Sequence, residues 1–82
     1  MIHITKVKPL ENYCLEVELE NGSCVILSLR SRLGTVRFGL LEDEAFFHSV
    51  TTDGNCIRWG NKIELSVSEI FQLAQKQGYH KE

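Results

Sequence analysis

The stretch CIRWGNKIELSVSEIF, residues 56–71, predicts the point where a β-sheet meets the helix that covers it. Ser66 and Glu69 stand three positions apart, the spacing of a capping box, in which each side chain bonds the other residue's backbone N–H. Leu65 before the serine and Ile70 after it occupy the positions of a hydrophobic staple. This pattern predicts that a helix begins directly after the serine.

Apolar residues recur after the cap at the three-to-four spacing of one helical face, which predicts a helix over residues 67–77. They are Val67, Ile70, Phe71, Leu73 and Ala74. Gly78 is placed to end this helix, and Lys76 lies near the C-terminal end, where positive charge is favourable.

A first β-hairpin is predicted upstream of this joint. Residues 13–20 alternate between apolar side chains and a cysteine followed by acids, which is typical of a half-buried strand. Asn21 and Gly22 then predict a two-residue type I′ turn, and residues 23–29 form the returning strand. Because the returning strand is apolar on both faces, we expect it inside the sheet, with the acidic strand nearer an edge.

A two-residue turn would fix the register of this hairpin. In that register Leu19 faces Cys24 and Val17 faces Ile26. Cys14 and Cys24 would then lie on opposite faces of the sheet, which argues against a metal site shared between them.

The remaining segments complete the expected fold. Residues 1–7 predict a strand that ends near Pro9, and residues 40–46 predict a short central helical turn. Asp53-Gly54 predicts the turn of a second hairpin. We therefore expect an α+β fold in which two β-hairpins form a small, mostly antiparallel sheet, with one C-terminal helix packed on it.

Length and charge bound what the chain can be. Its 82 residues predict one domain, 1–82, and a formal charge of -2 is too small to select a class of partner. A sequence-independent nucleic-acid binder would normally carry a basic excess, so direct nucleic-acid binding is not expected. No apolar run has the length of a membrane span, and the start MIHITKVKPL does not resemble a signal peptide. We therefore expect a cytoplasmic protein with no membrane partner.

Three cysteines, Cys14, Cys24 and Cys56, form no CxxC pair and no even-numbered disulfide framework. We expect reduced thiols that are mostly buried. A zinc site combining them with His3, His48 or His80 is the alternative, but metal sites usually show a close ligand pair. The sequence therefore predicts no metal and no cofactor.

Four residues are candidates for contact with a partner or ligand: Trp59, Arg37, Arg32 and His48. The arginines lie in RSRLGTVRFG, residues 30–39, which is either a surface connection with solvated arginines or a small anion or partner-contact patch. The tryptophan is either a core aromatic whose indole N–H bonds a backbone carbonyl or an exposed anchor for a partner.

The order of these signals resembles domain-of-unknown-function family 2442, a family of small bacterial domains. The matching pieces are ENGSCVILSL, an F-x-x-L segment at Phe38 to Leu41, EDEAFFHSV, I-x-W at Ile57 to Trp59, and IELSVSEIF. The resemblance covers nearly the whole chain to about Gln72. It implies an α+β domain with two hairpins and a C-terminal helix. Some similar domains are labelled antitoxin-like, and the family implies no catalytic residues.

Three functions are compatible with the sequence. The first is a non-enzymatic protein-interaction module, in one form the antitoxin of a toxin–antitoxin pair, with a small protein partner encoded nearby. The second is a small-ligand-binding or regulatory domain, with Trp59, Arg37 and His48 near a pocket. The third is an enzyme, but no nucleophile–base–orienter arrangement and no catalytic motif is visible. We also expect a homodimer, because a chain of this size leaves much apolar area near its surface, with the first strand as the better pairing edge.

Overall fold

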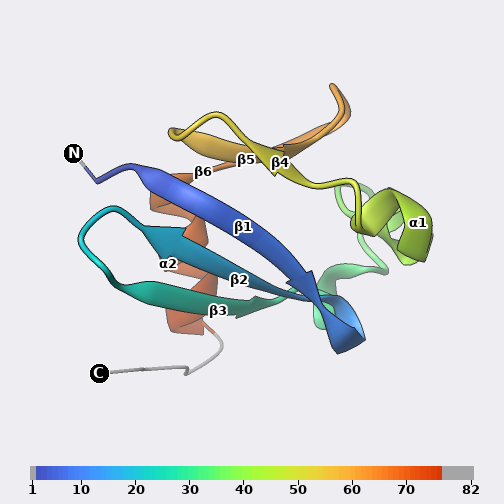
Figure 1. Cartoon of the computed structure of the whole chain (residues 1–82). Coiled ribbons are helices and arrows are strands. Elements are labelled where there is room, and N and C mark those ends of the chain that lie inside the picture. Colours follow the sequence, from blue (N-terminus) through green and yellow to red (C-terminus); the bar gives the residue numbers. More distant parts are fainter. Residues whose placement is uncertain (1, 77–82) are drawn as a thin grey trace.

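The computed structural model describes residues 2–76 and shows two three-stranded antiparallel sheets and one long helix (Figure 1). The first sheet has the order β1 (Ile4–Leu10), β2 (Cys14–Leu19), β3 (Cys24–Ser28). The second has the order β4 (Thr51–Thr52), β5 (Cys56–Trp59), β6 (Ile63–Ser66). The α+β class is confirmed, although the strands divide into two sheets and not one.

The long helix is α2 (Val67–Lys76), and its predicted start is confirmed. The backbone N–H of Glu69 donates to Ser66 Oγ at 3.2 Å, and the N–H of Ser66 donates to a Glu69 carboxylate oxygen at 3.4 Å. The predicted end at Gln77 and Gly78 lies outside the described residues. α2 follows β6 directly and packs against both β6 and β3, behind the first sheet in Figure 1.

The core lies between the inner face of the first sheet, the second sheet and α2. Its largest fully buried side chains come from all of these parts and from the segment between the sheets: Trp59, Phe47, Leu15, Leu27, Leu29, Leu41, Ile57, Leu65, Ile70 and Val17. The predicted helix face is confirmed at Ile70 and Ala74, which are buried, whereas Phe71 remains 39% exposed at its margin.

The turn of the first hairpin differs from the predicted one. The N–H of Leu19 donates to the carbonyl of Ser23 at 2.9 Å, and the N–H of Gly22 donates to the carbonyl of Leu19 at 3.0 Å. These bonds enclose a three-residue loop, 20–22, in which Gly22 has φ +89° and Asn21 does not have a positive φ. The loop is thus a type I turn followed by a left-handed glycine bulge, and the predicted type I′ turn is wrong.

The longer loop shifts the predicted register by one residue. Val17 pairs with Val25 and Glu18 pairs with Cys24, so every side chain of the returning strand changes face relative to the prediction. Cys14 and Cys24 therefore share the outer face of the sheet, and the prediction that they lie on opposite faces is wrong. The shift places Val25 and Leu27 on the inner face, opposite Val17 and Leu15, and leaves Ile26 on the outer face.

The strand order also differs from the expectation. The acidic strand β2 is central and β3 is at an edge. β1 supplies the reason, because its lysines lie opposite the acids: Lys6 pairs with Glu18 and Lys8 pairs with Glu16. Opposite charges at cross-strand positions are favourable, so β2 is stabilised inside the sheet by the strand beside it.

β1 ends at Leu10, directly after Pro9, so the predicted end of the strand near Pro9 is confirmed. The backbone of Leu19 bonds to the returning strand β3, and the direction of backbone bonding alternates along an antiparallel strand. The backbone groups of Glu16 and Glu18 therefore bond to β1. Their partners Lys6 and Lys8 point their backbone groups at β2, and Pro9 points away. The missing N–H of proline therefore removes no ladder bond at this position.

The segment between the sheets contains the predicted helical turn. It forms a 3-10 turn, Gly39–Glu42, and α1 (Glu44–Phe47), which Asp43 caps by accepting bonds from two backbone N–H groups. Two further 3-10 turns are Glu11–Tyr13 and Arg30–Arg32.

The predicted second hairpin is confirmed, and its turn joins the two sheets. β4 and β5 flank Asp53-Gly54, where Gly54 has φ +100°. The N–H of Ile4 donates to the carbonyl of Gly54 at 2.8 Å and so connects β1 to the second hairpin. Among residues 2–76 no helix combines the length and the apolar character that crossing a membrane requires.

Candidate functional site

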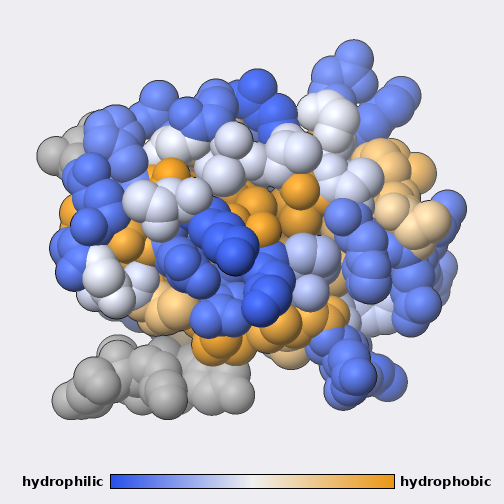
Figure 2. All heavy atoms as spheres, viewed as in Figure 1, coloured by the Kyte–Doolittle hydropathy of each residue, from blue (hydrophilic) through white to orange (hydrophobic). Residues whose placement is uncertain are grey.

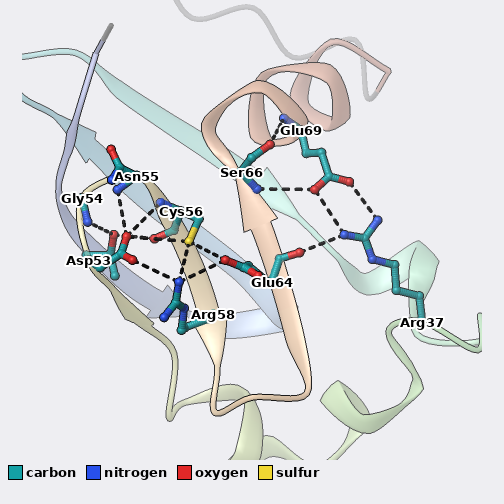
Figure 3. A network of polar contacts seen from close by, with 10 residues as sticks. Arg37, Asp53, Gly54, Asn55, Cys56, Arg58, Glu64, Ser66 and Glu69 are labelled. Carbon is teal, nitrogen blue, oxygen red and sulfur yellow. Dashed lines mark hydrogen bonds and ion pairs between the residues drawn. The ribbon is translucent and has the colours of Figure 1, made fainter.

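Arg37 joins the connecting segment to the start of α2 (Figure 3). Its guanidinium donates to both carboxylate oxygens of Glu69, at 2.9 and 3.2 Å, and to the backbone carbonyl of Glu64 at 2.8 Å. The same carboxylate also accepts the capping bond from the N–H of Ser66. The arginine lowers the pKa of Glu69, and the carboxylate raises the pKa of Arg37.

The segment around this arginine, which we call the Arg37 loop, residues 34–40, is held by local bonds as well. The hydroxyl of Thr35 donates to the carbonyl of Arg32 at 2.7 Å and accepts from the N–H of Phe38 at 3.3 Å. The Phe38 side chain is buried in the core, and the Arg37 guanidinium lies 5.1 Å from the centre of its ring. Anchors therefore hold the loop at a threonine, an arginine and a phenylalanine.

The Arg37 loop nevertheless directs two large apolar side chains into solvent. Val36 has a relative exposure of 103% and Leu40 of 55%. Single exposed apolar residues are ordinary on protein surfaces. Here, however, both lie in one short loop whose neighbouring residues are anchored. The fold therefore fixes the position of these two side chains and leaves them exposed.

A second polar cluster lies on β5 and β6 and in the turn that precedes β5 (Figure 3). Arg58 forms ion pairs of 3.0 Å with Asp53 and with Glu64. Asp53 accepts the backbone N–H of Asn55 at 2.9 Å and that of Cys56 at 3.2 Å. These backbone bonds, with the nearby arginine, lower the pKa of Asp53. The cluster thus fastens the hairpin turn to the neighbouring strand.

The thiol of Cys56 belongs to this cluster and is not activated for chemistry. It donates to a Glu64 carboxylate oxygen at 2.9 Å and accepts from Arg58 at 3.0 Å. Burial, and then the bond to Glu64, raise the pKa of Cys56, whereas the bond from this thiol and the charge of Arg58 lower the pKa of Glu64. A reactive cysteine needs the opposite shift, because the thiolate is the nucleophile.

The outer face of the first sheet holds three groups that could bind a metal ion. Ligand atoms of Glu16, Glu18 and Cys24 lie within 4.8 Å of one another. The thiol of Cys24 donates to Glu16 at 3.1 Å, and this bond is the main reason why its pKa is raised. Lys6 and Lys8 are the cross-strand neighbours of the two acids, so positively charged residues stand on the same face of the sheet.

The structure places Trp59 in the core, away from any surface. Its side chain is fully buried, stacks on the Phe47 ring at 6.2 Å between centroids, and donates its indole N–H to the carbonyl of Phe47 at 2.9 Å. The interpretation as a core aromatic bonded to a backbone carbonyl is therefore confirmed. An anchor for a partner would need an exposed ring.

The other predicted contact residues do not meet. His48 is exposed at the end of α1 and lines a shallow groove of about 870 Å³ with Pro9, Leu10, Glu11, Asn12 and Glu44. Arg37 instead reaches from its loop to Glu69 of α2. Arg32 is half-buried, and its Nε is buried and unpaired among the described residues. A pocket shared by Trp59, Arg37 and His48, as the second function required, is not formed.

Sequence reasoning singled out Arg37 but missed its partner, and it did not single out the second cluster of Asp53, Arg58 and Glu64. Arg37 and Glu69 are 32 positions apart, and no local spacing signals their contact. Arg58 and Glu64 form a cross-strand pair of β5 and β6 across a three-residue loop, 60–62, whereas a two-residue turn at Gly60-Asn61 would have set Arg58 opposite Ile63.

Comparisons of the chain with protein-family models, with curated proteins and with solved structures find no match. The fold and its polar clusters define a small α+β domain whose surface ion pairs tie loops and strands together.

Proposed function

We propose that the protein is a non-enzymatic protein-interaction module whose contact surface is the Arg37 loop. The observation that carries this proposal is the full exposure of Val36 beside the anchored residue Arg37. A rigid loop loses little conformational freedom when it binds, and less of the binding free energy is then spent on ordering. Exposed apolar side chains on such a loop supply the area that a partner buries.

The polar groups support the non-enzymatic part of the proposal. The arginines and carboxylates of both clusters are bonded to each other or to the backbone. These bonds hold loops in place and lower the pKa values of the carboxylates. A carboxylate that acts as a catalytic acid or base generally has a pKa raised towards neutral pH. The pKa values of Asp53, Glu64 and Glu69 are instead lowered.

The partner in this proposal is a small protein encoded beside this chain, and the location is the cytoplasm. The resemblance to family 2442 suggests one form of such a module, the antitoxin of a toxin–antitoxin pair. The test is co-expression with each neighbouring gene product, followed by size-exclusion chromatography and by a growth assay. We expect one neighbour to co-elute with the chain, and in the antitoxin form the chain restores growth that this neighbour inhibits.

The matched variants are Val36→Asp and Thr51→Asp. Both residues are exposed, but only the first lies in the Arg37 loop. We expect Val36→Asp to abolish co-elution and Thr51→Asp to preserve it. Co-elution that survives Val36→Asp, or neighbours that never co-elute with the wild-type chain, would contradict the proposal.

A second candidate function rests on the groove at His48. It is lined by two carboxylates, an imidazole and an amide, which suits a small polar or cationic ligand. Thermal-shift screening with small metabolites would favour this function if one compound raised the melting temperature of the wild type but not of His48→Ala.

A further inference from the structure

Arg32 presents a half-buried guanidinium that bonds to no other described residue. Its Nε is buried without a hydrogen-bond partner. Its two terminal nitrogens also bond to no described residue, but they are not buried. The burial of Nε shows that the side chain is held against the protein, while the terminal N–H groups are left open to an acceptor.

Other positive side chains of the fold stand beside acids. Both arginines of the polar clusters, Arg37 and Arg58, are bonded to carboxylates. Figure 2 shows hydrophilic residues over β1 and β2, where lysines of one strand are cross-strand neighbours of glutamates on the other. Arg32 has no such neighbour in its own segment, because residues 30–41 contain three arginines and no acid. A guanidinium taken partly out of water without a counter-charge costs free energy, and a carboxylate brought to it offsets that cost.

Arg32 lies directly beside the Arg37 loop. The N–H and the hydroxyl of Thr35 both donate to the carbonyl of Arg32, at 3.0 and 2.7 Å, and close a turn over residues 32–35. The Cα atoms at the two ends of such a turn lie within about 7 Å of each other. The exposed residue Val36 follows directly. A partner that covers about 800 Å² spans roughly 30 Å, so one partner can contact both Arg32 and Val36.

We propose that Arg32 binds a carboxylate of the protein partner that the Arg37 loop contacts. The inference rests on the proposed function and names the chemistry of the partner, an aspartate or glutamate beside an apolar side chain. The carboxylate accepts from the two terminal nitrogens of Arg32, and the apolar side chain covers Val36. The planar fork of a guanidinium matches the two oxygens of a carboxylate, and such charge-assisted bonds are stronger than neutral ones.

A carboxylate of a protein fits this surface better than the phosphates of a nucleic acid. Nucleic-acid backbones are bound by many cations, whereas the charge of Arg37 is already paired within the chain. The exposed side chains of the Arg37 loop are the aliphatic residues Val36 and Leu40, not aromatic rings on which bases stack. The net charge of -2 also repels a polyanion more strongly than a single carboxylate.

The first test uses short random peptides displayed on phage and selected on the purified chain. We expect the selected peptides to share an aspartate or glutamate next to a large apolar residue. Selection on Arg32→Gln should lose the acid from this pattern and keep the apolar residue, whereas selection on Val36→Ser should lose the apolar residue. Serine is used at position 36 because an aspartate there would bring a carboxylate close to Arg32.

The second test measures the pairing itself by isothermal titration. One selected peptide is compared with its amide counterpart, in which the acid is replaced by glutamine or asparagine. The amide peptide should bind the wild-type chain about tenfold or more weakly, the loss expected for charge-assisted hydrogen bonds. This first comparison needs no variant of the chain, and so it does not depend on a variant folding.

The variants complete the cycle. Arg32→Gln should bind the acidic and the amide peptide equally, because the acid then has no partner. Arg30→Gln is the matched control, since it removes the same charge from an exposed arginine that forms no ion pair with a described residue. It should preserve the difference between the two peptides.

Three results would overturn the proposal and leave the proposed function standing, provided that peptide binding still depends on Val36. They are equal affinities of the wild-type chain for the acidic and the amide peptide, a preference for the acid that persists in Arg32→Gln, and displacement of the peptide by an equal concentration of a single-stranded DNA oligonucleotide. A preference for the acid that needs Arg32 but is unchanged in Val36→Ser would support the acidic partner and contradict the Arg37 loop as the contact surface. Peptides that bind both variants as they bind the wild type, or a selection that enriches none, would overturn both proposals.

Discussion

Arg37 donates two hydrogen bonds, of 2.9 and 3.2 Å, to the two carboxylate oxygens of Glu69, the residue that also completes the cap of α2. One carboxylate thus serves the start of the helix and the position of the Arg37 loop. Because the arginine also donates to the carbonyl of Glu64, the loop is fastened to both β6 and α2.

Replacing Arg37 by methionine should loosen the Arg37 loop while the fold persists. Arg37 and Glu69 side chains are 50% and 38% exposed, and exposed ion pairs contribute about 1 kcal/mol or less to the free energy of unfolding. Hydrogen exchange at the amides of residues 35–38 should become faster, while exchange in β2 should not change.

The control is Arg30→Met, because the side chain of Arg30 forms no ion pair with a described residue. It should leave exchange in the Arg37 loop unchanged. Equal exchange in Arg37→Met and the wild type would show that the ion pair does not hold the loop.

Ser66→Ala should lower the free energy of unfolding by about 1 kcal/mol, the usual loss for a serine helix cap. Denaturant unfolding of the two proteins measures this difference. Ser68→Ala is the matched control, because Ser68 lies in the first turn of α2 on its exposed side. If the two alanine variants unfold at the same denaturant concentration, the Ser66 hydroxyl does not stabilise the helix.

Trp59→Phe should cost more than a lost surface hydrogen bond. The substitution leaves the carbonyl of Phe47 buried without its donor, a loss of about 1–3 kcal/mol, and also removes ring volume from the core. Tyr13→Phe is the comparison, because the Tyr13 hydroxyl donates at 2.6 Å to an exposed carbonyl of Glu42 that water can reach. Thermal unfolding should show the larger loss for Trp59→Phe, and the reverse order would contradict this account of the core.

Stability should fall in acid because three carboxylates have lowered pKa values in the folded chain. Backbone bonds lower the pKa of Asp53, the bond from Cys56 lowers that of Glu64, and Arg37 lowers that of Glu69. The stabilisation is complete above the ordinary carboxyl pKa of about 4 and is lost as pH falls through the lowered values, since the unfolded chain then binds more protons. Urea unfolding at pH 7 and pH 3 should show a smaller loss in Asp53→Asn than in the wild type. Equal losses would show that Asp53 does not contribute.

The elements of this fold that depend on local patterns could be predicted, and those that depend on a loop length could not. Ser66 and Glu69 signal the helix start within four residues, and the structure confirms it. Asn21-Gly22 signals a hairpin, but two turns fit that pair, and the three-residue form shifts the register by one. That shift moved Cys24 to the face of Glu16 and Glu18.

The candidate site depends on contacts between distant segments. Arg37 was singled out from the sequence, but its partner Glu69 is in a helix whose position depends on the whole core. The exposure of Val36 is likewise not signalled by any local pattern, because the segment around it forms turns without a regular alternation. Strand order depended on the pairing of Lys6 and Lys8 with acids of β2, which alternation within one strand does not reveal.

The affinity of this chain for the neighbouring gene product that co-elutes with it tests the central claim most directly. Isothermal titration should give a dissociation constant at least tenfold larger for Val36→Asp than for the wild type. A tenfold change corresponds to about 1.4 kcal/mol of binding free energy, and burial of a fully exposed valine side chain contributes about that amount. Thr51→Asp should bind as the wild type does. Equal affinities for Val36→Asp and the wild type would contradict the claim that the Arg37 loop is the contact surface.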